Sequence, residues 1–558
     1  MTRRHRLALL VISITVFIPI AAVIYHRLVN SSYSGFNPFS SQTTTTTTMT
    51  ESKSASPIIV VGSGLAGLSA AYTALESGAP SVLMLERAPK PGGNSIKASS
   101  GINGAPTRYQ PHPKNGQEDA KDVKSDEIES FLSDTFRSAG SRLPSSNVAP
   151  SVRKQREELI SVLVNSSSSA IDFLTQDLGI DLSVVAQLGG HSHARTHRGS
   201  GKTPPGAAIV TTLLSKLKEF GEERFVLKTA REVTKILTSD EGDRAGQVVG
   251  VEYRNIGAGD GPAESEIALG PVIFATGGFA GDTHGLLSKY RPDLAGLPST
   301  NEPRPGAHKL LTSVGAKLID MDSVQIHPTG FIDPANPGSQ LKFLAAEMLR
   351  GEGGILLHKG QRFVNELDTR EKVSGVIMGL EPLSEAESGG LKQWDVQILL
   401  DPGATEAAAG HVGFYVWKGL LKKVKVKDLD EATRETLREY ARVVRGEKKD
   451  ELGRKAFGHW RLGISTDGTI DAEEEVFIGS VTPITHFTMG GVVFDRQAEV
   501  LKTELGEEPQ RPIGGIWAAG EITGGIHGDN RLGGSSLLEC VVFGRIAGQQ
   551  AAAAVHKR

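Results

Sequence analysis

Cysteine is almost absent from this chain of 558 residues, and its scarcity excludes several kinds of site. The only cysteine is Cys540, so the chain cannot form an intramolecular disulfide. A single thiol also cannot supply a CxxCH haem attachment or a cysteine-ligated iron–sulfur cluster. Electrons used by this chain therefore cannot pass through a c-type haem or a cysteine-held cluster of its own.

An excess of charge of either sign is missing as well. The 61 Lys and Arg residues nearly balance the 64 Asp and Glu residues, which leaves a formal net charge of -3. Without a basic stripe, this balance does not indicate a nucleic-acid partner. The length exceeds one ordinary domain and suffices for two that share a large core. The 65 glycines fit a fold with many tight turns and close backbone approaches to a ligand.

Acidic residues are absent from the N-terminus before Glu51. Three arginines precede an uncharged apolar run, residues 7–25, which as a helix would span roughly 28 Å, close to a ~30 Å hydrocarbon core. We therefore expect residues 1–28 to be a membrane anchor, placing the protein on the endoplasmic reticulum or mitochondrial membrane. A removed targeting segment, such as a mitochondrial presequence, is the alternative. The Ser/Thr-rich residues 29–56 are expected to be a linker.

A glycine-rich turn lies between a predicted strand and a predicted helix. The β-branched run 57–61 leads into Gly-Ser-Gly-Leu-Ala-Gly at 62–67, and helix-forming residues follow. We expect Gly62 to permit the turn and Gly64 to let the backbone approach a pyrophosphate. Gly67 is expected to let the helix pack on the strand. This order of strand, turn and helix is typical of a dinucleotide-binding unit.

An acidic residue and a second glycine-rich loop extend this unit. Glu86 ends the next predicted strand, 81–85, about twenty residues further on, where an acid can accept hydrogen bonds from a ribose. Small residues then recur at 91–95 and 98–104. FAD needs a second stretch of backbone to hold its isoalloxazine end. NAD-dependent enzymes do not need this second stretch. The pattern therefore favours FAD.

Three later segments complete the predicted flavin site. Residues 271–279 and 515–521 each read as a buried strand that ends in a small-residue turn. Residues 530–538, Asn-Arg-Leu-Gly-Gly-Ser-Ser-Leu-Leu, lead into a predicted helix. The start of that helix would offer free N–H groups and its positive dipole end to a reduced, anionic flavin.

With these blocks in place, the sequence resembles the flavin subunit family of fumarate reductases and succinate dehydrogenases. It is most similar to the soluble single-chain enzymes of fungi and to the flavin domain of bacterial flavocytochrome c. The resemblance runs from about Ile58 to the C-terminal helix. Its motifs are Ala-Thr-Gly-Gly at 275–278, His-Phe-Thr-Met-Gly-Gly at 486–491, Ala-Ala-Gly-Glu at 518–521 and the block at 530–538.

The resemblance implies a non-covalently bound FAD. Where the membrane complexes of the family carry a histidine that bonds to FAD, this chain has Ser95. The residues expected to contact FAD are Gly62, Gly64, Ala66, Gly67, Glu86, Arg87, Gly93, Asn94, Ser95, Ser99, Ser100, Gly101, Ala275, Thr276, Gly277, Glu521, Ser535, Ser536 and Leu537.

The resemblance also implies fumarate reductase activity, in which reduced FAD passes a hydride to fumarate and succinate is formed. Fumarate is a planar dianion, so its reduction needs cations and hydrogen-bond donors at both carboxylates. The residues that match the family's catalytic motifs are His327, Glu347, Arg350, Arg370, His486 and Arg531.

In the family's mechanism, the positions matching His327, His486 and Arg531 hold and polarise the carboxylates. The position matching Arg370 protonates the carbon that does not receive the hydride. Glu347 and Arg350, three residues apart, would share a helix face and return protons to Arg370. Taken singly, such a pair is more often a surface ion pair, and a lone histidine is more often structural than catalytic.

Two departures from the family pattern concern the substrate pocket. Ala346 replaces a hydroxyl residue that stands beside the glutamate in the bacterial flavocytochrome, so one hydrogen bond to substrate is lost or comes from elsewhere. Phe487 stands where a more polar aromatic residue or a histidine is common. Its effect on substrate preference does not follow from the sequence.

The expected fold class is α/β, with a doubly wound, Rossmann-like FAD-binding domain, an inserted α+β capping domain and an N-terminal membrane helix. The FAD-binding domain is expected to comprise 57–340 and 488–558, and the capping domain 341–487. This capping domain would carry Glu347, Arg350, Arg370 and His486, so its closure would assemble the site and exclude water.

A histidine-rich stretch, 189–198, does not have the spacing of a zinc site, and neither cysteine nor acid stands beside it. We interpret it as a loop near the flavin and the mouth of the site, and we predict no metal.

Two rival functions remain open from the sequence. One is a same-fold dehydrogenase or oxidase acting on urocanate, aspartate or a ketosteroid, and the other is a non-catalytic, membrane-tethered flavin-binding protein. The complete set of His327, His486 and Arg531 favours a dicarboxylate, and the intact proton-relay residues argue against a non-catalytic role. The electron donor would be free reduced flavin, NADH or another protein.

Overall fold

The computed structural model describes residues 56–110, 127–143, 148–201, 203–257, 265–465 and 468–556. They belong to a compact unit, residues 55–558, that is distinct from residues 1–54. The expected anchor, 1–28, and all of the linker before Ser56 lie outside the described residues. Among the residues that are described, no helix is long and apolar enough to cross a membrane.

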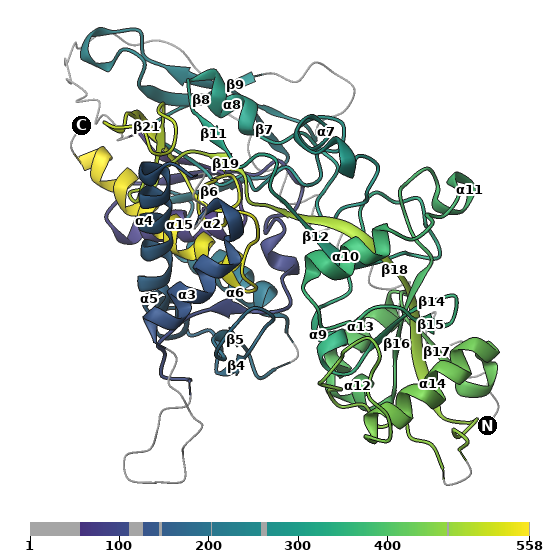
Figure 1. The fold of residues 1–558 in the computed structure, drawn as a ribbon. Helices are drawn as coiled ribbons and strands as arrows, with labels where there is room; N and C mark the ends of the chain where they lie inside the picture. The colour runs from purple at the N-terminus through teal and green to yellow at the C-terminus, as the bar shows by residue number, and fades with distance from the viewer. Residues whose placement is uncertain are drawn as a thin grey trace, which may run out of the picture. The chain divides into compact units, whose positions relative to one another are not determined.

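Six strands form the first sheet, in the order β20-β21-β10-β1-β2-β6 (Figure 1). Their bounds are β1 Ile58–Val61, β2 Val82–Leu85, β6 Phe225–Lys228, β10 Val272–Phe274, β20 Glu499–Leu501 and β21 Pro512–Ala518. All neighbours are parallel except β20 and β21, which are antiparallel. All four residues of β1 are buried, as expected for a central strand of a parallel sheet covered on both faces.

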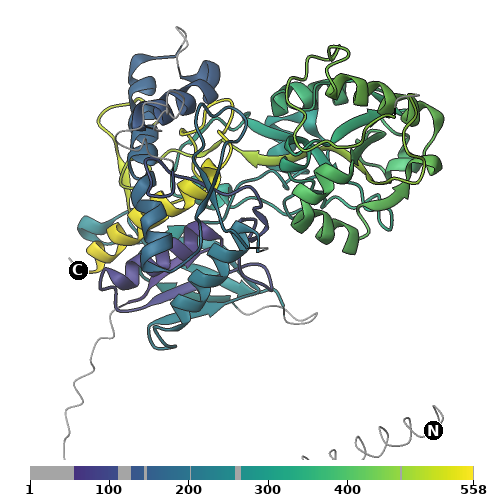
Figure 2. The same cartoon turned by 90° about the horizontal axis from the view of Figure 1, so that it is seen from below.

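The two faces of this sheet are covered differently. Ile58 and Val60 of β1 pack with helices α2 (Leu65–Glu76), α6 (Pro205–Lys218) and α15 (Ser535–His556), and Figure 2 shows α15 crossing α2. The alternate residues Ile59 and Val61 face the other side, because side chains alternate along a strand. There they pack with β7 (Arg231–Thr238), β8 (Val248–Asn255), β9 (Ser265–Leu269) and α8 (His308–Ser313).

The α/β fold class is therefore confirmed, although the second face is covered mainly by an antiparallel sheet where a doubly wound fold has helices. Strands β7, β8 and β9 alternate buried and exposed side chains, as a sheet with one solvated face does. The remaining elements of this part are β3 (Ile102–Asn103), β4 (Val184–Ala186), β5 (Thr196–Arg198), α3 (Ile128–Ser138), α4 (Pro150–Asn165), α5 (Ser167–Asp172) and α7 (Leu286–Tyr290).

A second, seven-stranded sheet has its own hydrophobic cores. Its order is β13-β12-β18-β16-β14-β15, with β17 paired to β18. The strands are β12 (Val324–Phe331), β13 (Phe343–Leu344), β14 (Ile355–His358), β15 (Gln361–Arg362), β16 (Val396–Leu400), β17 (Lys422–Lys425) and β18 (Glu475–Thr488). Its helices are α9 (Met348–Gly351), α10 (Arg370–Met378), α11 (Glu385–Ser388), α12 (Pro402–Ala407), α13 (Ala409–Trp417) and α14 (Glu431–Val444).

Strands β12 and β18 connect the two sheets. They pair antiparallel, and Figure 1 shows them side by side between the two sets of helices. Directly beyond β18, β19 (Gly491–Val492) pairs with β11 (Leu318–Ile319), and Val492 also bridges Thr523 beside the first sheet. The predicted boundaries at 340/341 and 487/488 stay predictions.

Candidate active site

The glycine-rich turn has the tight geometry that the sequence predicts. Gly62 adopts a φ of +102°, and a Cβ there would lie 2.4 Å from the carbonyl oxygen of Ala275. A Cβ on Gly67 would lie 2.0 Å from the carbonyl oxygen of Gly62. Both positions therefore exclude any side chain, so α2 begins directly against the end of β1.

Gly64 differs from its neighbours because protein atoms leave room beside it. A Cβ on Gly64 would meet only Ser95 Oγ, at 3.7 Å, and its φ of -67° is accessible to any residue. Ser95 Oγ accepts a hydrogen bond from Leu65 N at the start of α2. Across the turn, Gly277 has nothing within 4 Å of a Cβ position, and Thr276 Oγ1 is buried without a partner among the described residues.

This cradle fits a dinucleotide. Glycine stands where a ligand approaches the backbone, the start of α2 supplies N–H groups for a phosphate, and an unused hydroxyl faces the same turn. Among the described residues, only Ser95 Oγ comes within 4 Å of a Cβ position on Gly64, and no atom does so on Gly277. The donor set therefore agrees with FAD.

Glu86 lies at the end of β2, where the sequence places it, but its carboxylate already has protein partners. Oε2 accepts from Ser63 N at 2.9 Å and from Ser63 Oγ, and Oε1 accepts from Ala88 N at 2.7 Å. A carboxylate offers roughly four acceptor positions, so capacity for a ribose hydroxyl remains. Arg87 is bound to Pro305 O and to Glu232, on the side of the antiparallel cover.

The start of α15 is held in place by residues that the sequence did not single out. Asn103 Nδ2 donates to Gly533 O at 2.7 Å and to Ser535 Oγ at 3.1 Å, and Asn103 N donates to Gly534 O. His191 Nε2 also bonds Gly533 O, at 2.8 Å. These contacts fix the N–H groups of the first turn of α15, where the reduced flavin is expected.

Glu521 is partly buried next to these turns. Its Oε1 accepts from Thr488 N at 2.9 Å and from Thr488 Oγ1 at 3.2 Å. Burial raises the pKa of Glu521 to about 7. This side chain lies close to the Thr276–Gly278 turn, because a Cβ on Gly278 would lie 2.3 Å from Glu521 Oε1.

The other predicted flavin contacts surround the same turns. Asn94 Nδ2 donates to Asn301 Oδ1 at 2.7 Å, and a Cβ on Gly93 would approach the Gly64 backbone. A Cβ on Gly101 would clash with His197 O at 2.4 Å. Ala66 packs on Gly520 inside the fold. The remaining predicted contacts stay predictions: Ala275 directly follows β10, Ser535, Ser536 and Leu537 begin α15, and Ser99 and Ser100 precede β3.

Two histidines from the paired strands lie face to edge in the second part of the site. His327 of β12 and His486 of β18 have ring centroids 5.6 Å apart at 67°. Burial, followed by the charge of Arg370, lowers the pKa of His327 well below its usual value, and burial likewise lowers the pKa of His486. Both rings are therefore neutral at physiological pH.

The tautomer of His327 follows from its neighbour. Thr329 N donates to His327 Nδ1 at 3.2 Å, so Nδ1 is the acceptor and the proton of the neutral ring resides on Nε2. That Nε2 is buried and has no partner among the described residues. It is a donor available for an anionic ligand.

Arg370 and Glu347 form an ion pair at the edge of the site. Arg370, the first residue of α10, donates from Nε to Glu347 Oε2 at 3.1 Å, and its Nη2 contacts the same oxygen. Arg350 Nη2 lies 3.7 Å from Glu347 Oε1. Burial alone raises the pKa of Glu347, but the charges of Arg370 and Arg350 bring it down to about 2. The sequence-predicted chain Arg370–Glu347–Arg350 is thus contiguous in space.

Gln325 is a site residue that the sequence reasoning missed. Its Oε1 accepts from Arg370 Nη1 at 3.1 Å and from Arg531 Nη2 at 2.9 Å, so one amide oxygen joins the two arginines. Its Nε2 donates to Arg531 O and to Asn530 Oδ1. The signal was present, because residues two apart on a strand share a face and Gln325 precedes His327 by two.

Arg531 is a buried cation without a close carboxylate. In the described chain its hydrogen bonds go to Gln325 Oε1 and Leu532 O, and its Nε has no partner. Its guanidinium lies 4.5 Å over the ring of Phe487. Burial and the charge of Arg370 lower the pKa of Arg531 to about 10, which still leaves it protonated at neutral pH.

The constellation is therefore cationic. Three arginines, Arg350, Arg370 and Arg531, accompany Glu347, and two neutral histidines add donors. Glu521 and Glu539 act electrostatically on Arg531 without forming an ion pair with it among the described residues. An uncompensated buried cation is costly, so this arrangement requires an anionic partner. The site fits a small ligand with two negative charges.

The structure shows what surrounds Phe487 and Ala346, the two residues that depart from the family pattern. Phe487 lies between Arg531 and His527, whose ring centroid is 5.8 Å from that of Phe487. Ala346 is buried, and its N–H donates to the hydroxyl oxygen of Tyr415 at 3.2 Å. A tyrosine hydroxyl thus stands beside Ala346, and it donates in turn to Leu344 O at 2.9 Å.

The histidine-rich stretch 189–198 begins beside Glu347, but only its first part is the expected loop, because residues 196–198 form β5. A Cβ on Gly189 would be 3.9 Å from Glu347 Oε1, and His191 bonds the loop before α15. An acid does stand nearby, since Asp134 binds Arg195 at 2.6 Å and Ser192 at 2.7 Å. Over the described ranges, no group of three His, Cys, Asp or Glu side chains is placed to hold a metal ion.

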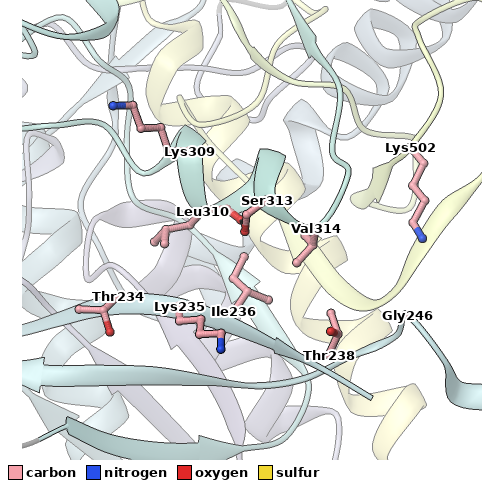
Figure 3. Close-up of a pocket in the computed structure, with 10 residues that line it drawn as sticks. All are labelled: Thr234, Lys235, Ile236, Thr238, Gly246, Lys309, Leu310, Ser313, Val314 and Lys502. Carbon is pink, nitrogen blue, oxygen red and sulfur yellow. Dashed lines mark hydrogen bonds between the residues drawn. The ribbon is translucent and has the colours of Figure 1, made fainter. Parts of the chain in front are cut away.

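An open cavity of about 600 Å³ lies elsewhere, between β7 and α8 (Figure 3). None of the predicted site residues lines it. Three lysines do, but the ammonium groups of Lys235, Lys309 and Lys502 point in different directions. They do not converge on a single anion, so this cavity does not compete with the site above.

Comparisons with known proteins agree with the geometry. A family described as an FAD binding domain matches residues 57–537. A fumarate reductase of Schizosaccharomyces pombe is 40% identical over 516 residues, which cover 90% of this chain and 90% of that protein. Fumarate reductase 1 of Saccharomyces cerevisiae is 40% identical over 515 residues, or 89% of this chain and 99% of that protein.

Solved structures give the same result. The open conformation of a flavocytochrome c3 fumarate reductase superposes with a TM-score of 0.67 at 28% identity. The match covers 90% of this chain and 78% of that one. The similarity thus spans both sheets, including the second sheet that carries His327 and His486.

Proposed function

Because this chain belongs to the family of FAD-dependent fumarate reductases, we propose that it reduces fumarate to succinate with electrons from bound FAD. The observation that carries the proposal is a pair of buried donors, His327 Nε2 and Arg531 Nε, that have no partner among the described residues and lie in a site with three arginines. A planar dicarboxylate satisfies these donors and compensates the positive charge.

The chain's own residues supply binding, orientation and protonation, and FAD supplies the hydride. Arg531 and the two neutral histidines bind the carboxylates and draw electron density from the double bond. Arg370 gives its proton to the carbon that does not receive the hydride. An arginine seldom acts as an acid because it stays protonated. Glu347, ionised and bonded to Arg370, would restore that proton at once from Arg350 and solvent.

Fumarate should reoxidise the reduced flavin directly. Full-length protein loaded with FAD is reduced anaerobically, fumarate is added, the flavin absorbance near 450 nm is followed, and succinate is quantified. We expect one succinate per flavin reoxidised. Crotonate, which keeps the double bond but has one carboxylate, should react far more slowly. A flavin that stays reduced with fumarate but reoxidises in oxygen would leave the fold intact and refute the substrate.

Replacing Gln325 with leucine should weaken the site without removing a charge. The variant loses the amide oxygen that accepts hydrogen bonds from both Arg370 and Arg531. The two guanidinium groups then lack a shared acceptor between them. Each lost hydrogen bond to a charged group is worth about 1.5–3 kcal/mol, so kcat/KM should fall roughly 10- to 100-fold. Steady-state kinetics measure the effect, and Gln340→Leu, at a residue that binds Leu297 O in another loop, is the control. Equal values for both variants would contradict the assignment.

The absence of a histidine at position 95 supports non-covalent FAD. Ser95 Oγ accepts a hydrogen bond from the start of α2, and a serine cannot form a histidyl–flavin bond. Denaturation should therefore release the flavin, which then passes through an ultrafiltration membrane that retains the protein.

We further propose that an external donor reduces the flavin, and that residues 1–28 attach the enzyme to the membrane of the endoplasmic reticulum or mitochondrion. Free reduced flavin, NADH or another protein remain the donor candidates. The support for attachment is the apolar run after three arginines. Washing the membranes with alkaline carbonate tests this attachment, because an anchored protein stays in the membrane pellet. Release of the full chain into the wash would contradict the anchor.

A further inference from the structure

The proposed proton path depends on a very short helix. Glu347 is the N-cap of α9, a helix of four residues that contains Arg350. A single helical turn is not stable in water by itself, because fixing its first turn costs more than one hydrogen bond returns. The spacing of Glu347 and Arg350 must therefore be held by what surrounds α9.

A segment outside every sequence motif, residues 450–460, binds the end of this helix. Arg454 Nη2 donates to Arg350 O at 2.9 Å, and Arg454 Nη1 donates to Gly354 O at 2.9 Å. His459 N donates to Glu352 O at 2.8 Å. Carbonyls at a helix C-terminus lack partners within the helix, so this segment supplies the bonds that α9 cannot make.

The contact is close enough to set the backbone position. A Cβ on Gly458 would lie 2.4 Å from the carbonyl carbon of Glu352, so segment and helix end meet backbone to backbone. A Cβ on Gly353 would likewise lie 3.1 Å from Phe457 O. The segment therefore leaves α9 little freedom to shift.

Arg454 also ties α9 to a buried carboxylate. Its Nη1 lies 3.1 Å from Glu366 Oε2, and both side chains are fully buried. Glu366 O in turn accepts from Arg350 Nη1 at 2.7 Å. Asp450 completes the network, since it accepts from Arg454 N at 2.7 Å and from Arg362 Nη1 at 2.7 Å.

This network leaves the functional side of Arg350 unused. Its Nη1 is bound from behind, whereas Nε and Nη2 have no hydrogen-bond partner among the described residues, and Nη2 lies 3.7 Å from Glu347 Oε1. The charged groups around Arg350 are Glu347, Arg370, Glu366 and Arg454. The Nη2 donor is thus left to face the carboxylate that passes protons.

We propose that residues 450–460 form a strap that positions the proton relay, with Arg454 as its positioning residue. The inference rests on the proposed fumarate reduction, because it concerns the refilling of Arg370. Arg454 does not touch substrate or flavin. It holds Arg350 where a proton can pass to Glu347, and through Glu347 to Arg370.

The test compares Arg454→Met and Arg454→Lys with Arg461→Met in the full-length, FAD-loaded enzyme. Arg461 is the matched control, because it follows the strap directly and its exposed side chain pairs with Glu406 on the surface. A displaced relay should lower kcat of Arg454→Met roughly 10- to 100-fold, with KM for fumarate nearly unchanged. Arg454→Lys keeps the positive charge but loses the planar guanidinium, so its kcat should lie between those of wild type and Arg454→Met.

A second measurement separates positioning from general damage. The side chain of Glu347 is 26% exposed, so a small buffer acid can reach it. Raising imidazole at constant pH and ionic strength should increase kcat of the Arg454 variants and leave wild type and Arg461→Met unchanged. FAD content and melting temperature are measured first, and Arg454→Lys decides the question if Arg454→Met does not fold.

The outcomes are distinct. A wild-type enzyme that does not reduce fumarate refutes the proposed function. If the wild type is active, two results refute the strap. The Arg454 variants keep the wild-type kcat, or their kcat falls and imidazole does not restore it. Loss of kcat with rescue by the buffer acid supports it.

Discussion

Replacing Arg370 with alanine should reduce fumarate turnover by roughly 10³–10⁴-fold while FAD stays bound, because general acid catalysis contributes about 10²–10⁴-fold and a cation is lost as well. Arg370 begins α10 on the second sheet and takes no part in the glycine cradle, so flavin content should match wild type. Its guanidinium contacts Glu347 and Gln325 only, among the described side chains.

The loss has a second physical cause. In the variant, Glu347 loses the nearer of the two arginines that hold its pKa near 2, so its pKa rises. Any charge that remains on Glu347 is then compensated by Arg350 alone and opposes a dianionic substrate more strongly. We therefore expect KM for fumarate to rise together with the fall in kcat.

Stopped-flow reoxidation of the prereduced flavin measures the effect directly. Arg370→Lys tests whether charge alone suffices, because lysine keeps the cation but not the planar fork that spans Glu347 and Gln325. Arg438→Ala, on the surface of α14 and paired with Glu431, is the matched control. Reoxidation by fumarate at close to the wild-type rate in Arg370→Ala would overturn the assignment of the proton donor.

Replacing Gly64 with alanine should remove FAD while leaving the apoprotein stable. The backbone angles of Gly64 suit alanine, and the added methyl meets no protein atom nearer than Ser95 Oγ at 3.7 Å. The free energy of unfolding of the apoprotein should therefore change by less than about 0.5 kcal/mol. A methyl pressed against a bound pyrophosphate costs about 1–3 kcal/mol, which is roughly a 5- to 150-fold loss of affinity.

Gly67→Ala is the informative contrast. Its methyl would lie 2.0 Å from Gly62 O inside the protein, so this variant should melt at a lower temperature with or without flavin. Titrating apoprotein with FAD, followed by the change in flavin fluorescence, gives the affinity, and thermal melting gives the stability. If Gly64→Ala binds FAD like wild type, the pyrophosphate does not pass beside this residue.

The flavin side of the molecule was predictable because its motifs sit at strand ends. The turns after β1, β10 and β21 lie at the same edge of one parallel sheet, since the carboxyl ends of parallel strands meet there. The covering of the other face was not foreseen. Strands β7 to β9 are half exposed, and only their pairing shows that they replace helices.

The catalytic residues were found by resemblance, and their supports were not. Gln325 carries no charge and so attracted no attention, although its place on β12 beside His327 was a usable signal. Asn103 and Arg454 act through backbone carbonyls far away in the chain, such as Gly533 O and Arg350 O. A carbonyl has no sequence signature, so only the folded structure could identify these two.

The order of strands in the first sheet has a consequence for biosynthesis. The central strand β1 is synthesised early. Its neighbour β10 (Val272–Phe274) pairs on its other edge with β21 (Pro512–Ala518), which comes more than 230 residues later in the chain, and α2 is covered by α15, which follows β21. Domains usually fold from the N-terminal side while synthesis proceeds. Here α2 stays uncovered until α15 has been made, so the glycine cradle is complete only late in synthesis.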